Sequence, residues 1–169
     1  MKIASLTIAA LAATKRLGRF LAEQLMVGDV LALQGALGAG KSELARAIIQ
    51  QVCPDETDIP SPTFTLVQAY ESDDNGSLLH FDLYRLAEPG DVFELGIEDA
   101  FVEAVCLIEW PERLAGYLPD HALTIEIDYD PATNGDREVT LSGDAAWQKR
   151  LNGTLPDKMV VSLSKSRRD

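Results

Sequence analysis

Residues 35–42, with the sequence GALGAGKS, restrict the fold of this chain more than any other segment. They match G-x-x-x-x-G-K-[ST], the pattern of a phosphate-binding P-loop. A short apolar run over 30–33 precedes them and suits a buried strand, while residues 43–52 carry apolar side chains at helical spacing. The motif therefore occurs between a predicted strand and a predicted helix, which is the setting that a P-loop requires.

The loop predicts how a nucleotide phosphate is held. Glycine lets the backbone approach the phosphate closely and adopt positive φ, and successive N–H groups at the start of a helix face the anion. We expect Lys41 to reach the β- and γ-phosphates and to act in catalysis, and we expect the Ser42 hydroxyl to bind Mg²⁺. The predicted phosphate-binding residues are Gly35, Leu37, Gly38, Ala39, Gly40, Lys41 and Ser42.

The composition argues against several classes of function. A net charge of −12 disfavours a broad surface for a nucleic-acid backbone, so a partner is expected to hold such a protein on RNA. No apolar run approaches about 18 residues, which predicts no membrane span. The apolar stretch near the N-terminus is too interrupted for a signal peptide. Cys53 and Cys106 lie outside any Cys-x-x-Cys motif, so we expect a cytoplasmic protein with free thiols.

The order of apolar patterns predicts a single-domain α/β fold of the P-loop NTPase type, with a mixed sheet, parallel core strands, antiparallel hairpins and flanking helices. The domain is expected to span residues 1–155, followed by a polar, flexible tail over 156–169. Predicted strands cover 3–8, 30–33, 64–70, 77–85, 105–108, 123–129 and 137–141. Predicted helices cover 10–26, 43–52, 89–95, 97–103, 111–118 and 144–151.

A P-loop nucleotidase needs an acidic residue at the end of a hydrophobic strand to hold its metal. Two residues meet this condition, Asp82 after the run 78–81 and Glu109 after the run 105–108. The run before Glu109 is apolar throughout, so it belongs beside the P-loop strand, where ligands collect at strand ends. We therefore expect Glu109 to bind Mg²⁺. Asp82, on a strand nearer the edge, is expected to position or activate the attacking water.

Several other residues have two interpretations each. Thr63 either senses the γ-phosphate and the metal, as in nucleotide switch loops, or simply leads into a strand. Trp110 either packs over the site or a partner, or belongs to the core. His80 is expected to be structural, because no nucleophile is paired with it. Arg85 and Arg113 are expected to be surface arginines more than phosphate ligands.

Four blocks of sequence together resemble the TsaE family, formerly called YjeE. They are GALGAGKS at 35–42, SPTFTLV at 61–67, HFDLYRL at 80–86 and EWP at 109–111, in the order and spacing of that family. The resemblance implies a Mg²⁺-dependent ATPase that is weakly active alone and works with TsaD and TsaB. Those partners place a threonylcarbamoyl group on a tRNA adenosine beside the anticodon, so the implied contact with tRNA is indirect.

The resemblance also implies roles for individual residues. It gives the same two metal ligands as the strand argument, requires Asp82 and Trp110 for activity, and points to Thr14 and Arg137 as base or ribose contacts. After the P-loop lysine the family usually has two threonines. This chain has a serine, which keeps the hydroxyl, and then Glu43, which places a carboxylate close to the phosphates.

Two other functions remain compatible with a P-loop. A small-molecule kinase needs a lid with clustered arginines, and the sequence shows only scattered arginines and no insertion of lid length. A GTPase-like switch fits the loop that carries Thr63, but the chain has no Asn-Lys-x-Asp motif for guanine. The favoured prediction is ATP hydrolysis used as a conformational signal.

Overall fold

The computed structural model describes residues 1–73, 76–129, 135–152, 155 and 160–163. The strands are β1 (Lys2–Ile8), β2 (Val30–Gln34), β3 (Val67–Ser72), β4 (Gly76–Asp82), β5 (Ala104–Glu109), β6 (Leu123–Tyr129), β7 (Arg137–Ser142) and β8 (Val160–Leu163). The α-helices are α1 (Leu11–Ala22), α2 (Lys41–Val52), α3 (Ile97–Glu103) and α4 (Ala145–Leu151). Two 3₁₀ helices, η1 (Pro89–Leu95) and η2 (Pro111–Leu114), connect them.

The strands form one eight-stranded sheet in the order β3-β4-β5-β2-β6-β7-β1-β8. The pairs β4–β5, β5–β2 and β2–β6 are parallel, and the remaining pairs are antiparallel. Every residue of β5 is buried, as expected for a parallel strand covered on both faces. The prediction of a mixed α/β sheet with a parallel centre and two flanking hairpins is therefore confirmed.

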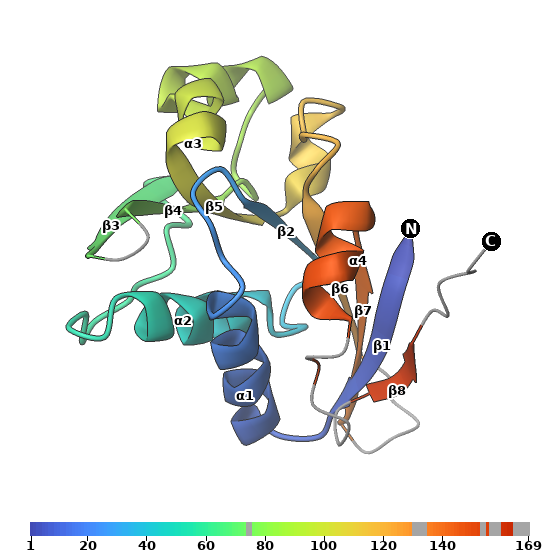
Figure 1. Ribbon diagram of the computed structural model, residues 1–169. Helices are drawn as coiled ribbons and strands as arrows, with labels where there is room; N and C mark the ends of the chain where they lie inside the picture. The colour runs from blue at the N-terminus through green and yellow to red at the C-terminus, as the bar shows by residue number, and fades with distance from the viewer. Residues whose placement is uncertain (74–75, 130–134, 153–154, 156–159, 164–169) are drawn as a thin grey trace.

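Helices cover both faces of the sheet (Figure 1), with α1 and α2 on one side and the segment around α3 on the other. Alternate residues of β5 separate two apolar clusters: Leu107 belongs to the cluster that includes α1 and α2, whereas Ile108 packs with α3 and the 3₁₀ helices. A strand between two such layers buries side chains in both directions. Packing on both faces of the sheet therefore fixes the positions of the ends of β2 and β5.

The structure differs from the sequence prediction at several element boundaries. β3 begins three residues later than predicted because Leu66 has a φ of 66°, in the left-handed region that a strand cannot include. Phe64, expected in that strand, is 83% exposed. The helix predicted over 111–118 is only the short η2, which ends before Ala115, a residue whose backbone is also left-handed.

The segment 156–169 was expected to be a polar tail, and β8 lies within it, antiparallel to β1. The other residues of that segment fall outside the described part of the chain. Among the helices that the structure describes, none is both long enough and apolar enough to cross a membrane.

Candidate functional site

The loop between β2 and α2 has the backbone that its glycines predict. Gly35 has a φ of 147°, and a Cβ there would lie 2.5 Å from the carbonyl oxygen of Ile127 on the neighbouring strand β6. Gly40 has a φ of 114° and forms the N-cap of α2. L-residues with a side chain rarely adopt such backbone angles, so the loop requires glycine at both positions.

Lys41 is buried at the first position of α2, with 4% of its surface exposed. Its ammonium donates to two carbonyls of the loop itself, those of Gly35 at 2.6 Å and Ala36 at 2.9 Å. Burial lowers the pKa of Lys41, and the negative charges of Glu109, Glu112 and Asp82 oppose that shift. The loop thus concentrates positive charge at the start of a helix in an otherwise acidic protein.

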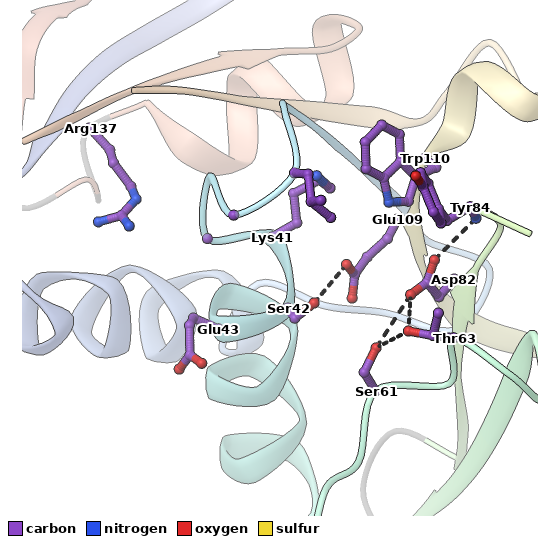
Figure 2. A pocket seen from close by; sticks show the side chains of 13 residues that line it. Lys41, Ser42, Glu43, Ser61, Thr63, Asp82, Tyr84, Glu109, Trp110 and Arg137 are labelled. Carbon is purple, nitrogen blue, oxygen red and sulfur yellow. Dashed lines mark hydrogen bonds between the residues drawn. The ribbon is translucent and has the colours of Figure 1, made fainter. Parts of the chain in front are cut away.

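The two predicted metal ligands contact each other. The Ser42 hydroxyl donates to Oε2 of Glu109 at 2.8 Å (Figure 2). Parallel pairing of β2 with β5 sets this distance, because it places Leu33 opposite Glu109, just before the loop leaves the sheet. Both side chains offer oxygen, the ligand atom that Mg²⁺ prefers. Among the residues that the structure describes, no group of three or more His, Cys, Asp or Glu could by itself hold a metal.

Asp82 lies beside Glu109, since the two residues are paired in register at the ends of β4 and β5. One carboxylate oxygen accepts hydrogen bonds from Thr63 at 2.8 Å and from Ser61 at 3.3 Å. The other accepts from the backbone N–H of Tyr84 at 3.1 Å. The carboxylate is therefore held from two directions, and Thr63 belongs to the site (Figure 2).

Sequence reasoning gave no role to Ser61 or Tyr84, which line the same pocket. The available signal was the spacing Ser61-Pro62-Thr63, which places two hydroxyls close enough for the 2.9 Å contact between them. Tyr84 packs against Trp110 with ring centroids 4.9 Å apart.

The pocket has a volume of about 330 Å³. The loop and the start of α2 form one wall, Ser61 and Thr63 another, and the ends of β4 and β5 the floor. Trp110 lines it with its ring centroid 4.0 Å from the Lys41 ammonium. That position depends on a left-handed backbone at Trp110, with a φ of 59°, directly after β5.

A second pocket of about 170 Å³ adjoins the first across Gly40 and Arg137, which line both. Thr14 and Ala39 lie here and not in the larger pocket. The Arg137 side chain approaches the loop from the opposite side to Asp82 (Figure 2). Its Nε is buried and has no hydrogen-bond partner among the described residues, which marks a donor available to a ligand at this point.

Three other side chains lie away from the contact between Ser42 and Glu109. Glu43 lines both pockets, but its carboxylate pairs with Arg46 one helical turn along α2 and points away from that contact (Figure 2). Arg85 stacks on the ring of Phe64 at 4.5 Å, and Arg113 is exposed outside the two pockets. Neither arginine is part of the candidate site.

The family described as threonylcarbamoyl adenosine biosynthesis protein TsaE matches residues 8–139. The tRNA threonylcarbamoyladenosine biosynthesis protein TsaE of Rickettsia conorii is 41% identical over 127 residues, which cover 73% of this chain and 69% of that protein. Its counterpart from Treponema pallidum is 38% identical over 130 residues, covering 76% and 93%. A crystal structure of YdiB from Bacillus subtilis superposes with a TM-score of 0.69 and 27% identity, over 89% of this chain and 93% of that one.

Proposed function

This chain belongs to the TsaE family of tRNA threonylcarbamoyladenosine biosynthesis, and we propose that it is a Mg²⁺-dependent ATPase that supports this modification. The observation that carries the proposal is the 2.8 Å contact between Ser42 and Glu109 next to a P-loop. A hydroxyl and a carboxylate at the end of parallel strands are the two protein ligands with which P-loop NTPases hold Mg²⁺. When bound, Mg²⁺ offsets negative charge on the β- and γ-phosphates.

The loop supports phosphate binding through the backbone and Lys41. Its glycines let the backbone approach an anion closely, at the positive end of α2. The Lys41 ammonium is bonded to the carbonyls of Gly35 and Ala36, within its own loop. Binding of a triphosphate exchanges these neutral acceptors for phosphate oxygens, which form stronger, charge-assisted hydrogen bonds.

The smaller pocket supports binding of the nucleoside. It continues from the loop toward α1, where Thr14 lines it together with Ile8 and Leu11. The unpartnered Nε of Arg137 lies at the boundary between the two pockets, as far as the described residues show. We therefore place the base or ribose near Thr14 and Arg137, and the phosphates in the larger pocket beside Trp110.

Asp82 supports hydrolysis by orienting the attacking water. In that step the water oxygen bonds to the γ-phosphorus, the bond from that phosphorus to the bridging oxygen breaks, ADP leaves, and the two protons of the water leave with the released phosphate. The carboxylate of Asp82 is fixed by Thr63, Ser61 and a backbone N–H, yet the oxygen that accepts from that N–H keeps one further lone pair for a water. Thr63 thereby couples the loop after α2 to the position of that water.

The net charge of −12 favours partners over direct contact with tRNA. We propose that TsaD and TsaB bind the tRNA and that ATP hydrolysis by this chain acts on their complex. Phosphate release should therefore be faster with the TsaD–TsaB pair than without it. No stimulation by the pair would count against this part of the proposal.

The test measures phosphate release from MgATP for the wild type and for Lys41→Ala and Glu109→Gln. We expect each variant to lower kcat/KM by about 100-fold or more, as for loss of one preorganised electrostatic contact. Glu98→Gln is the matched control, because Glu98 is an exposed glutamate on α3 outside both pockets and should leave kcat/KM unchanged. Undiminished hydrolysis by Lys41→Ala, or normal threonylcarbamoyladenosine formation in cells that contain only that variant, would refute the proposal.

A further inference from the structure

His80 contacts the candidate metal site from within the sheet. It lies on β4, two residues before Asp82, and only 1% of its surface is exposed. Its Nε2 is 2.8 Å from Oε1 of Glu109, whose side chain is itself 2% exposed. The other oxygen of the same carboxylate accepts from Ser42. Each oxygen of Glu109 is therefore held by a different element, β4 on one side and α2 on the other.

The second ring nitrogen of His80 shows which form of the ring makes this contact. Nδ1 is buried and has no hydrogen-bond partner among the described residues. A buried N–H without an acceptor is costly, so the proton belongs on Nε2, where it is donated to the carboxylate. In this form the ring supplies an N–H donor to Oε1 of Glu109.

We infer that His80 is a positioning residue for the metal-binding carboxylate, an inference that rests on the proposed function of Glu109. By fixing Oε1, His80 sets the rotation of the carboxylate so that Oε2 faces the Ser42 hydroxyl and the pocket. Partners that orient a metal ligand in this way contribute about 10- to 100-fold to metal affinity. The expectation from sequence that His80 is structural and not catalytic stays a prediction, and the sequence could not show its contact with Glu109, because these residues become neighbours through the pairing of β4 with β5.

The first arm of the test observes the ring directly. Nitrogen NMR of ¹⁵N-histidine-labelled protein is simple to assign, because the chain has two histidines and His121→Gln removes the other signal. We expect Nε2 of His80 to carry a proton in the nucleotide-free protein, since it donates to Glu109. An Nε2 without a proton would overturn the inference, and this arm requires no nucleotide to bind.

The second arm measures Mn²⁺ affinity by electron paramagnetic resonance with saturating ADP, for wild type, His80→Gln and His80→Phe. We expect His80→Phe, which lacks the donor, to lose about 10- to 100-fold in Mn²⁺ affinity. His80→Gln retains an N–H donor and should stay within about threefold of wild type. In a Glu109→Gln background, His80→Phe should have no further effect, since it acts through that carboxylate.

The inference is overturned if folded His80→Phe binds Mn²⁺ as tightly as the wild type. It is also overturned if His80→Phe lowers Mn²⁺ affinity as much in the Glu109→Gln background as in the wild-type background. If His80→Phe does not fold, the test relies on folded His80→Gln. A loss of Mn²⁺ affinity of more than tenfold in that variant overturns the inference. Retained Mn²⁺ affinity in that variant, together with a proton on Nε2 in the wild type, supports the inference. ADP affinity in the presence of EDTA separates the two proposals. Absence of ADP binding to the wild type contradicts the proposed function, whereas unchanged ADP binding with altered Mn²⁺ affinity is the result specific to His80.

Discussion

Gly18 lies in the contact between helices α1 and α2, and its replacement tests the packing beside the smaller pocket. A Cβ at Gly18 would lie 2.5 Å from the Cβ of Ala47 and 3.0 Å from that residue's carbonyl carbon. The second of these atoms is backbone, so it cannot move aside as a flexible side chain can. Gly18→Ala must therefore push the two helices apart or strain them.

The expected size of the effect is a balance of two opposing contributions. In a helix interior alanine is favoured over glycine by about 1 kcal/mol. Overpacking of a well-packed contact costs about 1–3 kcal/mol. The expected result is a net loss of about 1 kcal/mol in the free energy of unfolding, opposite in sign to the usual effect of this substitution. Because α1 also carries Thr14, the same displacement should widen the smaller pocket.

Urea unfolding followed by circular dichroism measures this change. Gly90→Ala is the matched control, since Gly90 is exposed, a Cβ added there would meet no described atom within 4 Å, and stability should change by less than about 1 kcal/mol. The double variant Gly18→Ala/Ala47→Gly removes one of the two close contacts and should show a favourable coupling of about 1 kcal/mol. A Gly18→Ala protein more stable than the wild type by about 1 kcal/mol, the gain expected at an unhindered helix position, would refute the close contact of α1 and α2.

Two further predictions concern the core and a helix terminus. Burial raises the pKa of the Cys106 thiol from 9.0 to about 12, so at pH 8 its thiolate fraction is lower by about a thousandfold. A thiol reagent at pH 8 should therefore leave Cys106 unmodified until urea unfolds the chain, and rapid labelling of Cys106 in the native protein would contradict this prediction. The free energy of unfolding gained from burying the neutral thiol should decline as the pH rises from 9 toward 12. At the start of α4, the carboxylate of Asp144 accepts a hydrogen bond from the Trp147 N–H at 2.9 Å, and Asp144→Ala should lower the free energy of unfolding by about 1 kcal/mol in the same urea assay. An unchanged unfolding midpoint would show that this cap contributes nothing.

The parts of the fold that follow from local patterns were predictable from the sequence. The continuous apolar run before Glu109 predicted a strand buried on both faces, and β5 is such a strand beside β2. The alternating residues of 123–129 and 137–141 predicted the hairpin of β6 and β7. In each case the signal is the burial pattern of one or two neighbouring elements, which a short stretch of sequence contains in full.

The remaining features depend on contacts between distant segments or on unusual backbone angles. The placement of β1 between β7 and β8 has no local signal, because its side chains would be buried beside any partner strand. The left-handed angle at Leu66 is not a preference of leucine, and the surrounding structure must impose it. Periodicity could not foresee either feature.

In the candidate site, too, some features have a local sequence signal and others depend on contacts between distant segments. The loop motif and the two strand ends predicted Lys41, Ser42, Asp82 and Glu109, and the fold brings these four side chains to one pocket. The fold also separates Thr14 from that pocket and places it in the adjoining one, a distinction that sequence spacing does not contain.

The positions of the two tryptophans have a practical optical consequence. Trp147 is 1% exposed and its indole N–H is bonded to the carbonyl of His121, so its fluorescence should be insensitive to small quenchers in solvent. Trp110 lines the larger pocket, with the Lys41 ammonium over its ring. Emission that acrylamide can quench therefore comes from Trp110, and the unmodified chain carries its own spectroscopic probe of whether the pocket is filled.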